Sequence, residues 1–184
     1  RSVRVIVGTT STLMSRPFLF AIKSFSLAVI DEAGQITEPN IVGLLATHTA
    51  GADPQQLIGR FILVGDYKQL PAVVQQSEQE SAVDDALLLG AGIRNCRDSL
   101  FERLIRHERA SGREQFIGIL QRQGRMHPDI AEFPNTMFYF HEHLRPVPLP
   151  HQQQPSLPYA LPSDDTLDDV LKQHRMVFIP SAPC

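Results

Sequence analysis

Three short apolar runs mark the first third of the chain, and each is followed at once by small or polar residues. They span residues 3–7, 27–30 and 61–64. Runs that are apolar throughout are typical of parallel strands that are buried on both faces. The intervals of about 25–30 residues between them are long enough for helical crossovers. The pattern predicts an α/β fold, a parallel sheet with flanking helices, whose polar clusters gather at the carboxyl edge of the strands.

Helical patterns dominate the second half of the chain. Asp98 is the expected N-cap of a helix that runs through Arg109, with Gly112 beyond its end. A second helix, interrupted by Pro134, is expected over residues 129–140, and a short one over residues 166–174. One face of the first helix would carry its apolar residues Leu100, Phe101, Leu104 and Ile105.

Two further apolar runs and one proline-rich segment complete the pattern. Residues 116–120 predict a fourth buried strand and residues 176–179 a final one. Residues 146–162 contain six prolines and a glutamine tract, which predicts an extended, poorly ordered excursion. Because strand-like runs stand near both ends, we expect the chain to be a piece of a longer protein.

Composition narrows the class of protein. With 184 residues, 42% of them hydrophobic, the chain can bury a core, and no apolar run approaches the roughly 20 residues of a membrane-spanning helix. The net charge of −3 provides no general basic field, so any contact with nucleic acid must be local. Two cysteines, Cys96 and Cys184, are too few for a disulfide scaffold. This fits an intracellular, cytoplasmic location, or the nucleus in a eukaryote.

The first chemical signal is the pair Asp31-Glu32, directly after the second apolar run. A carboxylate at the end of a strand can hold Mg²⁺, and its neighbour can orient or deprotonate an attacking water. Acidic residues that only decorate a helix N-terminus are the alternative.

The second signal is the sequence Gly65-Asp66-Tyr67-Lys68-Gln69-Leu70-Pro71, after the third apolar run. It puts an acid and an amide on a loop beside Asp31-Glu32. A glutamine there can hydrogen-bond a phosphate oxygen or the attacking water. A simple Gly-Asp turn with a proline stop is the alternative.

The third signal is Gln121-Arg122-Gln123-Gly124-Arg125-Met126-His127-Pro128. An arginine fork at the end of a strand suits bidentate contact with a phosphate that carries developing charge. A solvated basic loop is the alternative.

Together, in this order and spacing, the three segments resemble motifs of the superfamily 1 helicases. The specific branch is the one that includes the nonsense-mediated-decay RNA helicases and the Dna-two-type helicase–nucleases. Residues 31–35 resemble its Walker B motif, Asp-Glu-Ala-x-Gln, residues 65–71 its motif III and residues 123–128 its motif IV. The resemblance covers about residues 1–140 and implies a partial RecA-like P-loop NTPase fold. Residues 1–113 would be the back part of one RecA-like domain, and residues 114–184, with the proline-rich excursion, the start of the next.

The resemblance also implies roles for single residues in a nucleic-acid-dependent ATPase or helicase that uses ATP and Mg²⁺. Asp31 would bind Mg²⁺, Glu32 would be the general base, and Gln69 would sense the γ-phosphate. The remaining roles are nucleotide binding by Gln35 and Asp66, a γ-phosphate contact by Arg125 from the second domain, and contacts of Thr9, Thr10 and Ser11 with single-stranded DNA or RNA.

The chain also departs from the family. It contains no Gly-x-x-x-x-Gly-Lys-[Ser/Thr] phosphate loop, so we expect the isolated 184 residues to lack ATPase activity. Where the family often has a tyrosine that stacks on the base, this chain has Gly124. A non-catalytic module that binds single strands or a protein, and a degenerate scaffold, remain alternatives.

Exposed sheet edges could pair two copies of the chain. The arginines of residues 103–113 alternate with glutamates, which predicts a salt-bridged solvent face.

Overall fold

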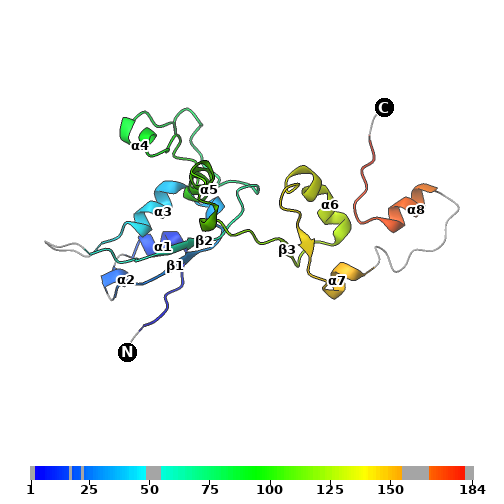
Figure 1. The fold of residues 1–184 in the computed structure, drawn as a ribbon, viewed down its shortest axis with the longest axis horizontal. Coiled ribbons are helices and arrows are strands. Elements are labelled where there is room, and N and C mark those ends of the chain that lie inside the picture. The colour runs from blue at the N-terminus through cyan, green and yellow to red at the C-terminus, as the bar shows by residue number, and fades with distance from the viewer. Residues whose placement is uncertain (1–2, 17, 22, 49–54, 155–165, 181–184) are drawn as a thin grey trace. The chain divides into compact units, whose positions relative to one another are not determined.

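The computed structural model describes residues 3–16, 18–21, 23–48, 55–154 and 166–180 (Figure 1). The chain divides into two compact units, Arg1–Ile117 and Gly118–Cys184. No helix among the described residues is long and apolar enough to cross a lipid bilayer.

Unit 1 is built around a βαβ element. Strand β1 (Ala28–Ile30) runs parallel to β2 (Phe61–Leu63), with Ala28 opposite Phe61 and Ile30 opposite Leu63. Between them the chain passes through a 3-10 turn, η1 (Ala33–Gln35), and helix α3 (Glu38–Leu45). The remaining elements of the unit are α1 (Thr10–Met14), α2 (Phe18–Ala21), α4 (Ala86–Gly90), α5 (Leu100–Ala110) and η2 (Glu114–Phe116). The parallel pair with helices confirms the expected mixed α/β class.

The core of unit 1 lies between this strand pair and the helices. Helix α1 packs against α3, and α5 packs against both α3 and η1. Ile41 of α3 and Ala33 of η1 are completely buried, and Ile30 of β1 and Leu100 of α5 are nearly so. This packing fixes the carboxyl ends of β1 and β2, where the polar loops begin.

The expectation of strands buried on both faces is wrong for β1 and β2. Val29 is 63% exposed and Ile62 is 50% exposed, because these side chains point away from the helices. Side chains alternate between the two faces of a strand, so the paired residues Val29 and Ile62 lie on the same face of the sheet, and that face is open. Among the described residues, nothing buries that second face.

The other three apolar runs do not form strands. Residues 3–7 have no regular structure and pair with no described segment, and Val7 is 90% exposed. In residues 116–120, Phe116 ends the turn η2 and the rest has no regular structure. Residues 176–179 also pair with no described segment. A strand requires a hydrogen-bonding neighbour, which an apolar run by itself does not supply.

Helix α5 has the expected extent but a different cap. Ser99, not Asp98, is the N-cap, and its hydroxyl accepts a hydrogen bond from the backbone N–H of Glu102 at 3.2 Å. Gly112 follows the helix with a φ of +66°, a left-handed conformation that glycine adopts without steric cost. Asp98 instead offers its backbone carbonyl to the N–H of Glu38 at 2.8 Å.

Unit 2 contains a second, shorter parallel pair. Strand β3 (Arg122–Gln123) pairs with β4 (Arg145–Pro146). Helix α6 (Pro128–Met137) lies between them in sequence and continues through Pro134, so the expected interruption is absent. Helix α8 (Thr166–Gln173) is where the sequence predicts it.

The proline-rich segment is not simply an extended excursion. Strand β4 includes Pro146, and helix α7 (Pro150–Gln153) follows within the same segment. Pro150 is the first residue of α7, where its fixed φ and missing N–H are tolerated. The part of the prediction that concerns residues 155–162 lies outside the described residues.

Candidate functional site

The loop after β1 carries Asp31, the predicted Mg²⁺ ligand, and Glu32, the predicted general base. The Asp31 carboxylate accepts a hydrogen bond from the backbone N–H of Glu32 at 3.0 Å. Glu32 has a φ of +52°, which is uncommon for a residue with a side chain, and Gln35 donates from Nε2 to the Glu32 carboxylate at 3.4 Å. Both acids are exposed. The loop is therefore a tight turn that presents two carboxylates to solvent.

The loop after β2 is organised around Asp66. Its carboxylate accepts from the backbone N–H of Lys68 at 3.0 Å and from Nε2 of Gln69 at 3.1 Å. These bonds hold the amide of Gln69 against the loop that carries it. Asp66 therefore positions Gln69, in addition to any contact of its own with a ligand.

The two loops touch through their backbones. The N–H of Ala33 donates to the carbonyl of Val64 at 2.8 Å. A Cβ atom placed on Gly65 would lie 2.9 Å from the nitrogen of Gly34, and one on Gly34 would lie 3.0 Å from the carbonyl oxygen of Asp66. Such an approach is possible because both residues are glycines. The structure thus brings the loop of Asp31 and Glu32 together with that of Gln69.

An aromatic contact ties the second loop to α5. Nη1 of Arg109 donates to the hydroxyl of Tyr67 at 2.9 Å, and the guanidinium lies 5.9 Å from the centre of the Tyr67 ring. The salt-bridged solvent face expected from the arginines of residues 103–113 is present in two pairs, Arg106 with Glu102 and Arg113 with Glu108. The Arg113 guanidinium lowers the pKa of the Glu108 carboxyl.

One arginine of this series has a different role, which sequence reasoning missed. Arg103 binds the buried carboxylate of Glu38, at the start of α3, through Nε at 2.7 Å and Nη2 at 2.5 Å. Glu38 is only 3% exposed. The pair links α5 to the helix that follows the Asp31 loop. Its signal in the sequence is weak, because the two residues are 65 positions apart.

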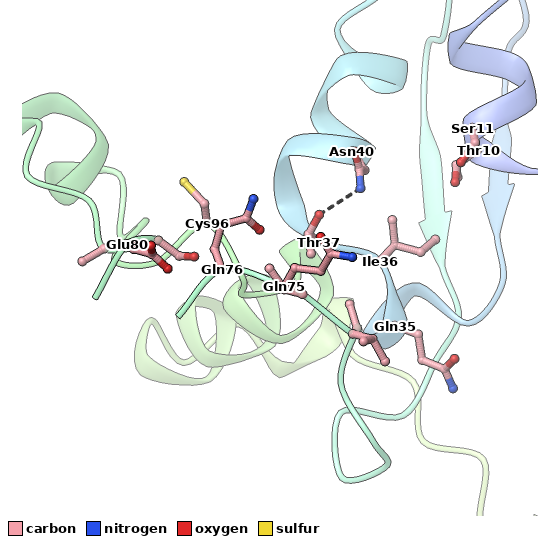
Figure 2. Close-up of a pocket in the computed structure, with 15 residues that line it drawn as sticks. Thr10, Ser11, Gln35, Ile36, Thr37, Asn40, Gln75, Gln76, Glu80 and Cys96 are labelled. Atoms are coloured by element: carbon pink, nitrogen blue, oxygen red, sulfur yellow. Dashed lines mark hydrogen bonds between the residues drawn. The ribbon is translucent and has the colours of Figure 1, made fainter. Parts of the chain in front are cut away.

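A hollow of about 800 Å³ lies beside these loops in unit 1 (Figure 2). Thr10 and Ser11 of α1 line it together with Gln35 of η1. The lining is largely uncharged and polar, and Figure 2 also labels Thr37, Asn40, Gln75, Gln76, Glu80 and Cys96 around it. Within it, Nδ2 of Asn40 donates to the hydroxyl of Thr37 at 3.0 Å. Two of the three residues predicted to contact nucleic acid therefore share one hollow with the Walker B-like loop.

Thr9 is placed differently from its two neighbours. Its hydroxyl caps α1, accepting from the N–H of Thr12 at 3.2 Å and donating to the Thr12 hydroxyl at 2.9 Å. Thr9 does not line the hollow.

Arg125 belongs to unit 2 and lies in the turn after β3. Oε1 of Gln123 accepts from the backbone N–H of Arg125 at 2.9 Å and from that of Met126 at 2.6 Å. Nδ1 of His127 accepts from the N–H of Asp129 at 3.3 Å and caps α6. The side chain of Arg125 is exposed. The turn is well defined, and it presents the guanidinium to solvent.

The acidic side chains fit Mg²⁺ that is held jointly with a nucleotide. The described residues contain no group of three or more His, Cys, Asp or Glu side chains that could hold a metal ion alone. Mg²⁺ usually takes one or two protein carboxylates and completes its shell with waters and substrate phosphates. The exposed Asp31 carboxylate, at a strand end, suits this kind of site.

Comparison with known proteins identifies the class. Two family models, each described as an AAA domain, match residues 1–77 and 96–179. The chain therefore carries AAA domains of the superfamily 1 helicase type, which confirms the resemblance drawn from the three motifs.

Individual relatives show a distant similarity to helicases and helicase/nucleases. The DNA replication ATP-dependent helicase/nuclease JHS1 of Arabidopsis thaliana is 34% identical over 134 residues, which are 73% of this chain and 8% of that protein. DNA2 of Mus musculus, with the same description, is 34% identical over 73% of this chain and 10% of its own length. An uncharacterized ATP-dependent helicase of Methanocaldococcus jannaschii is 33% identical over 73% of this chain and 16% of its own length. The chain thus spans a small part of each relative.

Proposed function

We propose that the chain is part of an ATP-driven motor that translocates along or unwinds DNA or RNA. The observation that carries the proposal is the backbone contact between the two strand-end loops, Ala33 N–H to Val64 carbonyl at 2.8 Å. This contact brings the loop that carries the two acids against the loop that carries the amide. General base and phosphate sensor must be neighbours if both act on one γ-phosphate.

In this proposal each loop has one task in ATP hydrolysis. Asp31 holds Mg²⁺, which neutralises charge on the phosphates when it is bound. Glu32 accepts a proton from the attacking water, and Gln35, hydrogen-bonded to Glu32, keeps that carboxylate oriented. Gln69, held by Asp66, reports the presence of the γ-phosphate. Arg125 from the second domain stabilises the charge that develops on the transferred phosphoryl group.

Nucleic acid would run past the hollow of Figure 2. The hydroxyl and amide groups that line the hollow, among them the hydroxyls of Thr10 and Ser11, can donate hydrogen bonds to phosphate and sugar oxygens of the nucleic acid. Gln35 belongs to both the hollow and the Walker B-like loop. A conformational change at the nucleotide can therefore be transmitted to the bound nucleic acid through the single turn that contains Gln35.

The proposal is tested by Glu32→Gln in the complete protein. This change keeps the size of the side chain and removes its ability to take a proton. We expect kcat for nucleic-acid-stimulated ATP hydrolysis to fall by about 10²–10⁴-fold with little change in KM for ATP. Glu78→Gln, at an exposed carboxylate to which we give no role, is the control. ATP turnover near the wild-type rate in Glu32→Gln would exclude the general base.

A second measurement uses the 184-residue chain alone. Because its sequence lacks a phosphate loop, we expect no Mg²⁺-dependent ATP hydrolysis above background. Turnover by the pure chain would contradict this. If the complete protein also fails to hydrolyse ATP but binds single strands in a salt-dependent manner, the non-catalytic binding module is the better description.

A further inference from the structure

None of the roles proposed above involves helix α7 of unit 2. It lies in the proline-rich segment, in which no motif occurs, yet one of its residues is among the most deeply buried polar groups described. Gln152 is 3% exposed, whereas its neighbours Gln153 and Gln154 are exposed. A buried amide is costly unless its hydrogen bonds are made, so its partners indicate what the helix holds.

Among the described residues, the Gln152 side chain makes its hydrogen bonds to the turn that carries Arg125 and to the start of α7. Its Nε2 donates to the carbonyl of Gln123 at 3.0 Å and to that of Met126 at 2.9 Å. Its Oε1 accepts from the N–H of Leu149 at 3.3 Å. The two carbonyls stand at the two ends of the turn. The amide group of Gln152 therefore links the backbone before Arg125 to the backbone after it.

The Gln123 side chain also makes hydrogen bonds to the backbone of this turn. Its Oε1 accepts from the N–H groups of Arg125 and Met126, and its Nε2 donates to the Met126 carbonyl at 2.8 Å. The Met126 carbonyl thus receives two amide donors, one from Gln123 and one from Gln152. Two glutamines, 29 positions apart, share one hydrogen-bond network around the turn.

Two more contacts of this segment reach Gly124. Nε2 of His151 lies 2.9 Å from the carbonyl of Gly124. A Cβ atom at Gly124 would lie 3.2 Å from Cδ1 of Leu149, so this methyl group fills the space beside the glycine. Leu149 and His151 therefore both contact Gly124, the residue before Arg125, while Gly124 itself stays exposed.

We propose that α7 is a clamp on the Arg125 turn and that Gln152 is its central positioning residue. Gln152 fixes the backbone on both sides of Arg125, and through it the direction in which the guanidinium leaves the turn. The proposal rests on the proposed role of Arg125 at the γ-phosphate. An arginine that acts only in the transition state must be held in place beforehand, because a misplacement of about 1 Å costs up to roughly a hundredfold in rate.

The test compares Gln152→Met with Gln153→Met in the complete protein. Methionine keeps the length of the side chain and its burial but has no amide, so Gln152→Met removes the clamp bonds. Gln153→Met makes the same change at an exposed position of the same helix. His151→Ala, which removes one exposed contact, is a milder second variant that remains informative if Gln152→Met does not fold.

The first readout is independent of catalysis. Trypsin cleaves after Arg125 when the turn opens, and mass spectrometry identifies that cut. We expect faster cleavage at Arg125 in Gln152→Met and, to a smaller extent, in His151→Ala, with Gln153→Met unchanged. Equal cleavage in Gln152→Met and wild type, or in His151→Ala and wild type if the former does not fold, would overturn the clamp.

The second readout is ATP hydrolysis in the presence and absence of Arg125. We expect Gln152→Met to lower kcat by about ten- to a hundredfold with KM for ATP nearly unchanged. In an Arg125→Ala background, the same change should cost less than about twofold, since residues that act as a unit are not additive. A faster tryptic cut without loss of kcat, while Arg125→Ala does lose kcat, would overturn the positioning role. If Arg125→Ala itself leaves kcat unchanged, the proposed function of Arg125 fails, and the trypsin readout still decides on the clamp.

Discussion

The buried ion pair between Arg103 and Glu38 provides the sharpest prediction about stability in unit 1. Arg103→Met removes the guanidinium and keeps an apolar side chain of similar length on α5. The Glu38 carboxylate, whose side chain is 4% exposed, then loses both hydrogen bonds from Arg103. The carbonyl of Ala91 also loses its bond from Nη1 of Arg103, which is 2.9 Å long.

The size of the effect follows from burial. Removing one partner of a buried ion pair typically costs about 3–5 kcal/mol, because an uncompensated charge remains inside the protein. The Arg103 side chain is 23% exposed. Water can therefore enter from its side, and we expect a cost near the lower end, about 3 kcal/mol in the free energy of unfolding. For a chain of this size that corresponds to a fall of about 6–12 °C in Tm.

Arg106→Met is the matched control. Arg106 lies on the same helix and pairs with Glu102 four residues earlier, but its side chain is 68% exposed. Exposed pairs of this kind contribute about 0.3–0.5 kcal/mol. Urea unfolding followed by circular dichroism compares the two variants. Similar shifts in the urea midpoint for both would refute the reasoning. Glu38→Leu combined with Arg103→Met should recover part of the loss, because no unpaired charge is then buried.

Two further predictions concern the loops around the site. Gly65→Ala should lower the free energy of unfolding by about 1–3 kcal/mol, because the new Cβ would meet the backbone nitrogens of Gly34 and Ala33 at 2.9 and 3.1 Å. The control in thermal unfolding is Gly118→Ala, whose Cβ would have no atom within 4 Å. Equal Tm values for the two variants would contradict the close approach of the loops. At the edge of the hollow, the backbone N–H and hydroxyl of Ser77, both at 2.8 Å from the Glu80 carboxylate, lower the pKa of the Glu80 carboxyl from its ordinary value. The turn is therefore fully stabilised above the pKa of a glutamate in the unfolded chain, and it loses this contribution as the pH falls through the lowered pKa of Glu80. An NMR titration should show the Glu80 pKa rising in Ser77→Ala, and an unchanged titration would contradict the assignment.

Local signals predicted much of unit 1. The strands β1 and β2 and the loops after them follow from apolar runs that end abruptly in Asp31 and Gly65. The contact between the loops follows from parallel pairing, because the carboxyl ends of adjacent parallel strands meet at one edge. Helix α5 follows from its apolar face and its glycine end; only the cap moved by one residue, from Asp98 to Ser99.

The failures have a common physical origin in contacts that are distant in sequence. Residues 3–7 and 116–120 are as apolar as β1, but a strand also needs a neighbour with which to pair, and none of the described segments provides one. The burial of Glu38 could not be predicted from the sequence around it, because it depends on the ion pair with Arg103 of another helix. Helix α7 was hidden by its prolines, although Pro150 stands at the one helical position that suits it. Its link to Gln123, 29 residues away, is visible only in three dimensions.

The central claim is that the Asp31 loop, Gln69 and Arg125 act on one triphosphate. A crystal structure of the complete protein with Mg²⁺ and a non-hydrolysable ATP analogue measures this directly. We expect a carboxylate oxygen of Asp31 in the inner or water-mediated shell of Mg²⁺, and the Gln69 amide and Arg125 guanidinium within about 3.2 Å of γ-phosphate oxygens. A bound nucleotide whose γ-phosphate lies beyond the reach of Gln69 and Arg125 would contradict the account.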